Sequence, residues 1–289
     1  MQAETFHFHV GAFDCFAVSD GFGIYPDPAR TLFAGAPEAA LTQALHEHNI
    51  QPEEWLEWVS PFICLLIRTD RHLVLVDTGY GTVDFMPNAG KLLQNLKTLD
   101  ITPPDIDTVI LTHGHRDHLH GVTEDATDQV VFSNARHVMW RGEWEFRNSA
   151  EGLDFDDGDA SRKLAALAGH LDLIDSELEI VPGIHAIHAP GHTPGHMALA
   201  IVSGGEQVLD LVDAVGHPIH MEHPEWNMRV DYQPEQAERT RRMLLTRAAA
   251  EHASILAYHF DFPGLGHVQQ QGDAWKWQPI AATKDSEGL

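Results

Sequence analysis

Short apolar runs that each end in a histidine or an aspartate constrain the fold of this chain most strongly. The run 107–111, DTVIL, leads into the segment 112–118, THGHRDH, so three histidines and an aspartate follow a strand-like stretch. Four further runs end in the same way, at Asp77 (LVLV), His192 (IHAIHAPG), Asp213 (VLDLV) and His259 (SILAY). Strand ends hold side chains at one rim of a sheet, and the loops beyond them are free to form a pocket. The pattern predicts a sheet protein with a polar site at one edge.

The spacing within 113–118 indicates metal binding. Residues two apart in a strand point to the same side, so His113 and His115 can offer two imidazoles to one centre. Asp117 and His118 follow a turn and cannot face the same way, which predicts a second centre close to the first. The chain has 21 histidines among 289 residues, so a lone histidine would carry little weight. The order and the spacing of the set carry the prediction.

The charge of the chain argues against several partners. The formal net charge is −25, which repels nucleic-acid backbones and anionic lipid head groups. No apolar run approaches membrane-spanning length, and the opening residues lack a basic segment followed by an apolar one. Only Cys15 and Cys64 are present, too few for a disulfide framework. We expect a cytoplasmic protein with no nucleic-acid or membrane partner.

The order of strand-like and helix-like segments predicts an α/β fold. No repeat, low-complexity tract or Gly/Ser linker divides the sequence, so we expect one domain over residues 1–289. The polar turn Asp70-Arg71 between two apolar runs predicts a hairpin. Apolar residues at helical spacing predict one helix from about Pro87 to Leu99 and another over 234–252. Sheets covered by helices, in layers, fit this order.

The motifs resemble those of the metallo-β-lactamase superfamily of hydrolases. The match comprises HGHRDH at 113–118, LVDTG at 75–79, PGHTPGH at 190–196, and the later strand-end aspartate and histidine. Segments 223–245 and 257–268 are similar to the branch that contains methyl parathion hydrolase, dihydrocoumarin lactonases and quorum-quenching lactonases. The resemblance implies an αββα sandwich, in which two mixed sheets pack together and helices cover the outer faces.

The resemblance also implies a dinuclear metal site. Residue by residue, it assigns His113, His115 and His192 to the first ion, Asp117, His118 and His259 to the second, and Asp213 to both as a bridge. Asp77 matches a position that orients the site without binding metal. Imidazole and carboxylate ligands suit Zn²⁺, which we expect, and also Fe, Mn or Co.

The expected chemistry is hydrolysis of a small apolar ester. Two divalent ions that share a water lower its pKa to about 7, which yields hydroxide as the nucleophile, and they polarise the substrate oxygen. Asp117 and Asp213 are the expected catalytic carboxylates, and Asp117 is a candidate proton relay. A lactone or an aryl ester is the first expectation, an organophosphate triester the second, and a homodimer is one assembly left open.

Three alternatives remain at this point: a glyoxalase-like thioester hydrolase, a persulfide dioxygenase with one iron, and a non-enzymatic metal-binding protein.

Three aromatic side chains are candidate walls of a substrate pocket, namely Trp140, Trp144 and Phe262. Aromatics at helical spacing also fit a hydrophobic core, and for the two tryptophans we give both interpretations equal weight.

Histidines outside the motif receive other interpretations. His217, His220 and His223 resemble a further metal site, but surface or pocket-wall positions fit them better. His7 and His9 alternate with Phe6 and Phe8, which predicts an outer strand with one wet face.

Overall fold

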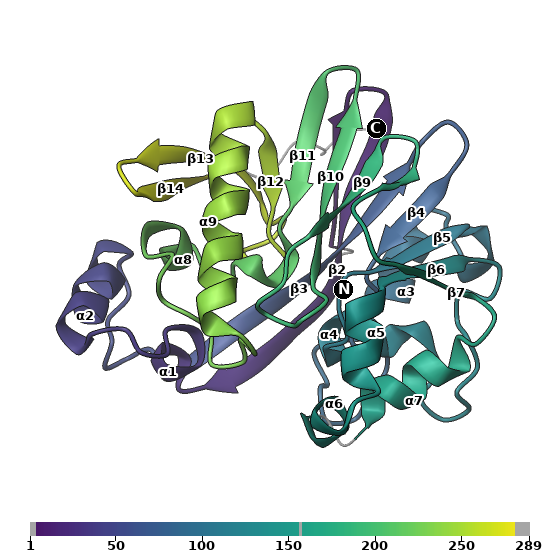
Figure 1. The fold of residues 1–289 in the computed structure, drawn as a ribbon, viewed down its shortest axis with the longest axis horizontal. Helices are drawn as coiled ribbons and strands as arrows, with labels where there is room; N and C mark the ends of the chain where they lie inside the picture. The colour runs from purple at the N-terminus through teal and green to yellow at the C-terminus, as the bar shows by residue number, and fades with distance from the viewer. Residues whose placement is uncertain (1–3, 156–157, 281–289) are drawn as a thin grey trace.

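Two seven-stranded mixed sheets form the centre of the molecule, and the helices cover their outer faces (Figure 1). The computed structural model describes residues 4–155 and 158–280. This arrangement confirms the predicted αββα sandwich. The assignment of residues 1–289 to one domain stays a prediction, and residues 1–3, 156–157 and 281–289 of that range lie outside the described residues.

The first sheet has the strand order β1-β2-β3-β4-β5-β6-β7. Its strands are β1 (Thr5–Val10), β2 (Phe13–Pro26), β3 (Glu57–Arg68), β4 (Leu73–Val76), β5 (Thr108–Leu111), β6 (Arg136–Trp140) and β7 (Leu171–Ile174). Neighbours from β1 to β4 are antiparallel, and those from β4 to β7 are parallel. The predicted hairpin at Asp70-Arg71 joins β3 to β4, with Arg68 opposite Leu73.

The second sheet has the order β14-β13-β12-β11-β10-β9-β8. Its strands are β8 (Glu179–Val181), β9 (Ile184–His188), β10 (Met197–Ser203), β11 (Glu206–Asp210), β12 (Ser254–Leu256), β13 (Leu265–Gln271) and β14 (Ala274–Pro279). The pair β11 and β12 is parallel, and the other neighbouring pairs are antiparallel.

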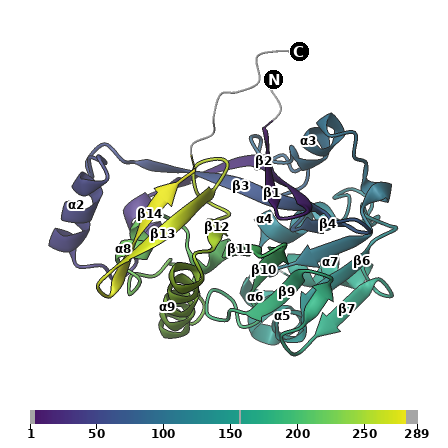
Figure 2. The same ribbon diagram turned by 90° about the horizontal axis from the view of Figure 1, so that it is seen from above.

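The helices lie outside the sheets and in the connections between strands. They are α1 (Pro28–Leu32), α2 (Glu38–Glu47), α3 (Leu92–Thr98), α4 (Arg116–Leu119), α5 (Arg141–Arg147), α6 (Ala150–Phe155), α7 (Asp159–Ala166), α8 (Ile219–Glu222) and α9 (Pro234–Glu251), with the 3₁₀ turns η1 (Pro103–Asp105), η2 (His120–Val122) and η3 (Val212–Ala214). Helix α3 packs on β2 and α9 on β13, on opposite sides of the paired sheets (Figure 2). Among the described residues, no helix combines the length and the apolar character needed to cross a bilayer.

Strand β3 shows how side chains that alternate along a strand contribute to the cores on both faces of the first sheet. Ile63 and Ile67 face the core between the two sheets, whereas Phe62 and Leu66 face the core beneath α3. All four are buried, so the strand reads as a continuous apolar run in the sequence. A third core, which includes Leu244 and Leu245 of α9, lies between the second sheet and that helix.

Helix α3 begins five residues later than the predicted start at Pro87. The carboxylate of Asp20, on β2, accepts hydrogen bonds from the backbone N–H groups of Tyr80, Gly90 and Leu92. A side chain from another element thereby satisfies the N–H at the start of the helix. Nothing in the local sequence encodes that partner, so the boundary prediction was wrong.

Candidate metal centre

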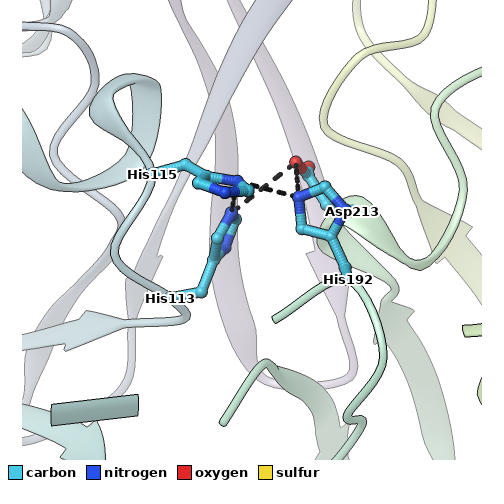
Figure 3. A group of neighbouring side chains, drawn as sticks. All are labelled: His113, His115, His192 and Asp213. Atoms are coloured by element: carbon cyan, nitrogen blue, oxygen red, sulfur yellow. Dashed lines mark hydrogen bonds and ion pairs between the residues drawn. The ribbon is translucent and has the colours of Figure 1, made fainter. Parts of the chain in front are cut away.

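The seven predicted ligand residues lie together where strands of both sheets end. They form two groups, one of His113, His115, His192 and Asp213, the other of Asp117, His118 and His259. Within each group, one ligand atom from every residue lies within 4.8 Å of the others. Figure 3 shows the three imidazoles and the carboxylate of the first group pointing toward one another.

The first group is tightly convergent. The Nδ1 atom of His115 lies 3.0 Å from Nε2 of His113 and 2.9 Å from Nε2 of His192. The Oδ2 atom of Asp213 lies 3.1 Å from Nε2 of His192 and 3.7 Å from Nε2 of His113. Three imidazoles and one carboxylate match the ligand types and the number that a tetrahedral zinc site uses.

Asp213 lies between the two groups. Its Oδ2 faces His192, and its Oδ1 lies 3.2 Å from Nε2 of His259 and 3.4 Å from Nε2 of His118. The residue before it, Val212, has a φ of 49°, a left-handed conformation that is strained for a β-branched side chain. The backbone therefore adopts an unfavourable conformation where it presents this carboxylate.

The second group completes the arrangement. The Oδ2 atom of Asp117 lies 3.5 Å from Nε2 of His259 and 3.6 Å from Nε2 of His118. Within the described part of the chain, Nε2 of His118 and Oδ1 of Asp213 are buried and make no hydrogen bond. Buried polar atoms that make no hydrogen bond are costly, and a cation between these two would offset that cost. The donor set fits two divalent ions.

Asp77, the predicted orienting residue, contacts His118. Its Oδ2 lies 2.7 Å from Nδ1 of His118, which leaves Nε2 directed at the centre. The backbone N–H and the hydroxyl of Thr112 also donate to this carboxylate, at 2.9 and 2.8 Å. The Nδ1–H of His259 donates in a similar way to the carbonyl of Pro61, at 3.0 Å. These contacts select the imidazole nitrogen that faces the metal position.

Sequence reasoning missed Asp231, which performs the same task for His192. Its Oδ1 accepts from Nδ1 of His192 at 2.8 Å, and its Oδ2 accepts from the N–H of Met228 at 2.9 Å. The buried guanidinium of Arg241, on α9, lies 3.5 Å from Oδ2 and also donates to the carbonyl of Ala214. The only available signal was general: a buried ligand histidine needs a partner for its other nitrogen.

Sequence reasoning also missed Glu143, a fully buried carboxylate on α5. Its Oε1 accepts from the N–H of Gly114 and from Nε of Arg147, each at 2.9 Å. Its Oε2 accepts from the hydroxyl of Thr193 at 2.5 Å and from the N–H of Gly195 at 3.2 Å. This side chain joins the loop that carries His113 and His115 to the loop that carries His192.

Burial and neighbouring charges set the protonation of the groups. Burial, together with neighbouring cationic imidazoles, lowers the pKa of His113 and of His115 well below the usual value. Burial raises the pKa of Asp213, but the facing imidazoles of His259, His118 and His192 outweigh it and hold that pKa well below the usual value. Neutral imidazole and ionised carboxylate are the forms that bind metal. For His118, His192 and His259, burial lowers the pKa, but the facing carboxylates outweigh it and raise the pKa, so an ion must displace protons there.

A cavity of about 430 Å³ opens beside both groups. The ligand residues His115, Asp117, His192, Asp213 and His259 line one part of it. The remaining wall is mainly apolar and aromatic and includes Tyr25, Leu32, Trp58, Tyr80, Met228 and Val230.

The predicted aromatic walls lie elsewhere. Trp140 is buried in the core between the sheets and stacks on His188, with ring centroids 4.4 Å apart. Phe262 packs against that same core, and Trp144 packs against the core beneath the outer helices. None of the three is among the residues that line the described cavity. The side chain of α5 that contacts the histidine loops is Glu143, whereas Trp140, at the end of β6, and Trp144, on α5, pack in the cores.

The cluster at 217–223 does not assemble as a third ligand group within the described residues. The Nε2–H of His220 donates to the carbonyl of Leu32 at 2.7 Å, and its Nδ1 accepts from the N–H of Gly216 at 3.2 Å. His223 stacks on Trp226 with ring centroids 3.8 Å apart. None of the three histidines lines the described cavity, and His220 is fully buried, so the predicted surface or pocket-wall position is wrong for His220.

Comparisons with known proteins agree with this geometry. Residues 64–225, more than half of the chain, match the family model of the metallo-beta-lactamase superfamily. An N-acyl homoserine lactonase of Bacillus sp is 26% identical over 190 residues, which cover 60% of this chain and 70% of that protein.

Two solved structures share the fold over almost the whole chain. AidC, a dizinc quorum-quenching lactonase in complex with a product, superposes with a TM-score of 0.87 at 24% identity and covers 96% of this chain and 98% of that one. A hydrolase of the beta lactamase superfamily, AbOPH, superposes with a TM-score of 0.86 at 24% identity, with coverage of 97% and 99%.

Proposed function

The chain belongs to the metallo-β-lactamase superfamily, and we propose that it is a dinuclear metal hydrolase that opens small apolar lactones. The observation that carries the proposal is the position of Asp213, which lies between two ligand groups and lines a cavity whose remaining wall is mainly apolar. One carboxylate facing two imidazole groups is the arrangement that a bridging ligand requires.

The proposed assignment of residues follows the two groups. We propose that His113, His115 and His192 hold one ion, that Asp117, His118 and His259 hold the other, and that Asp213 contacts both. Zinc is the proposed metal, supported by the imidazole and carboxylate donors and by the dizinc centre of the structurally similar AidC. When bound, two such ions activate a water molecule and polarise the substrate carbonyl.

The residues of the cavity bind and orient the substrate. Leu32, Met228 and Val230 offer apolar surface for an acyl chain, and Trp58 adds an aromatic face. Pocket walls of this kind bind by apolar area, so the reacting carbonyl can be held near the ligand groups while the chain lies against the wall. A neutral substrate also avoids repulsion by a protein of net charge −25.

Two tyrosines and Asp117 line the cavity and can contact the reacting end of the substrate. Tyr25 and Tyr80 both line the cavity wall. Burial and the nearby Asp117 carboxylate raise the pKa of Tyr80 to about 12, so its phenol stays protonated and can donate to a substrate oxygen. The Asp117 carboxylate lines the cavity and can take the proton that the attacking water releases and pass it to the leaving alcohol.

Aryl esters are a second candidate substrate class. The cavity wall contains the rings of Tyr25, Trp58 and Tyr80, which can face an aromatic leaving group. Lactones remain first because the curated relatives of this chain include N-acyl homoserine lactonases.

The test is a substrate panel on purified, zinc-loaded protein. It comprises N-acyl homoserine lactones with short and long acyl chains, a phenyl ester, an organophosphate triester and a glutathione thioester. We expect the highest kcat/KM for the lactones, an increase with acyl length, and loss of all activity with chelator. His185→Ala serves as a control because this histidine is exposed on β9. Preference for the anionic thioester, or turnover unaffected by chelator, would contradict the proposal.

A further inference from the structure

Another His-x-His pair, His7 and His9, lies on the β1–β2 hairpin, outside the cavity. His7 and His9 point to the solvent side of β1, while Phe6 and Phe8 pack against the core between the sheets. The side chains of His7 and His9 are 47% and 62% exposed, so solvent ions can reach both imidazoles. The wet face predicted for this strand therefore carries two neighbouring imidazoles.

A carboxylate converges on the two imidazoles from the adjacent strand. Asp14 lies directly opposite His9 in the antiparallel pairing of β1 and β2. Its Oδ1 atom lies 3.0 Å from Nε2 of His7 and 3.3 Å from Nδ1 of His9. One ligand atom from each of the three residues lies within 4.8 Å of the others, a limit that the two groups at the cavity also meet.

The hairpin is held in place by contacts with the second sheet. At its turn, the N–H of Gly11 donates to Glu206 at 3.1 Å, and the N–H of Ala12 donates to the hydroxyl of Ser203 at 3.0 Å. The His7 ring also stacks on Phe16, with centroids 4.6 Å apart and an interplanar angle of 16°. An imidazole and a strand pair held in this way lose little freedom when an ion binds.

We propose that His7, His9 and Asp14 form a third binding site, for a divalent transition metal ion such as Cu²⁺, Zn²⁺ or Ni²⁺. Two nitrogen ligands and one carboxylate select these ions over Ca²⁺ and Mg²⁺, which prefer oxygen ligands. Water completes the coordination because the site is open to solvent. The net charge of −25 raises the local concentration of any cation near this face.

The third site is separate from the buried centre. The hairpin contacts β10 and β11 at residues 203–206, where these two strands join. His192 and Asp213 lie near the other end of the same strands, before the start of β10 and after the end of β11. The third site can therefore be occupied or lost without a direct effect on hydrolysis.

The test is a metal titration of the full chain after both buried groups have been loaded with zinc. Addition of Cu²⁺, followed by calorimetry and electron paramagnetic resonance, should show one further equivalent with nitrogen ligation. His7→Ala and His9→Ala should each lower the affinity for this additional ion by at least about tenfold to a hundredfold. That is the range for the loss of a contact that supports a ligand. Zinc content and lactone turnover should stay unchanged.

A matched control uses His185→Ala, because His185 is also an exposed strand histidine beside a carboxylate, Glu179 at 3.8 Å, but belongs to no described ligand group. Asp14→Asn keeps the size of the side chain and should weaken the same equivalent. Thermal unfolding verifies that each variant is folded. The proposal is overturned if no third equivalent binds, or if His7→Ala and His9→Ala leave it as strong as His185→Ala does.

Discussion

Two of the His-x-His pairs in the chain lie in candidate metal groups, one at the rim of the sheets and one exposed on the β1–β2 hairpin. Buried carboxylates hold the loops and imidazoles of the first centre: Glu143 for the loops, and Asp77 and Asp231 for individual imidazoles. The pair His7 and His9 has one carboxylate and open solvent. The spacing alone places two imidazoles on the same side of a strand. Burial and supporting hydrogen bonds determine their affinity for a metal ion and their protonation.

The largest expected effect concerns the carboxylate shared by both buried groups. Asp213→Asn keeps the shape of the side chain but removes its charge, so kcat/KM for a lactone should fall at least about a hundredfold, the upper range for a weakened metal environment. Thermal unfolding should change far less. Steady-state kinetics and a melting curve measure both quantities. A fully active variant would show that Asp213 does not bridge.

Glu143→Gln tests whether a residue outside the ligand set controls the first group. Gln retains one acceptor oxygen and places an NH₂ group against donors that need an acceptor, so the two histidine loops should loosen. We expect metal affinity of the first group to fall about 10- to 100-fold. Glu145→Gln is the matched control, because Glu145 lies on the same helix and is exposed. Equal metal affinities in the two variants would show that Glu143 contributes only to folding.

Acidification should weaken the buried centre by proton competition. Burial lowers the pKa of His192, but the carboxylates of Asp213 and Asp231 outweigh it and raise that pKa to about 9. Below that pH an ion must displace a proton from the imidazole, so apparent affinity falls about tenfold per pH unit for each proton displaced. Zinc competition titrations between pH 6 and 8 measure this slope, and excess zinc should restore activity. If the loss of activity at low pH does not depend on zinc concentration, another titrating group causes it.

Trp58→Ala and Trp144→Ala separate a cavity wall from a core. Trp58 lines the cavity, so its truncation should weaken long-chain lactones by about 1–3 kcal/mol of transition-state binding and short ones little. Trp144 packs in a core, so its truncation should not change the preference among substrates. Metal content must match the parent protein in both variants. A loss of chain-length preference in Trp144→Ala alone would reverse this placement.

The smallest effect is expected at the exposed pair. His7→Ala removes a side chain that is 47% exposed, so the free energy of unfolding should change by less than about 0.5 kcal/mol. Urea unfolding in the absence of added metal measures this change. A larger loss would mean that the stacking of His7 on Phe16 stabilises the hairpin strongly.

The ligand groups could be predicted because their signal is local. Four of the seven residues lie within 113–118, and each of the others follows an apolar strand. The supporting carboxylates could not be predicted in the same way. Glu143 bonds to Gly114, 29 residues away in the sequence, and Asp231 bonds to His192, 39 residues away. Contacts between residues so far apart produce no periodic pattern in the sequence.

The residues of the cavity wall could not be predicted from the sequence around the histidine motif, for a related reason. Tyr25 and Trp58 lie on the long strands β2 and β3, which run past the site from the N-terminal half of the chain. Their distance in sequence from the histidine motif hides the contact. The two tryptophans closer to the motif, Trp140 and Trp144, fill cores instead.

The most direct test of the central claim is a zinc titration of metal-free protein in which lactone turnover and bound zinc are measured together. We predict that activity rises until two tightly bound ions are present per chain, and that weaker binding beyond two adds no activity. His118→Ala should then hold close to one tight ion and turn over poorly, because it loses a ligand of the second group. Full activity with a single bound ion, in the parent protein or in this variant, would contradict a dinuclear centre.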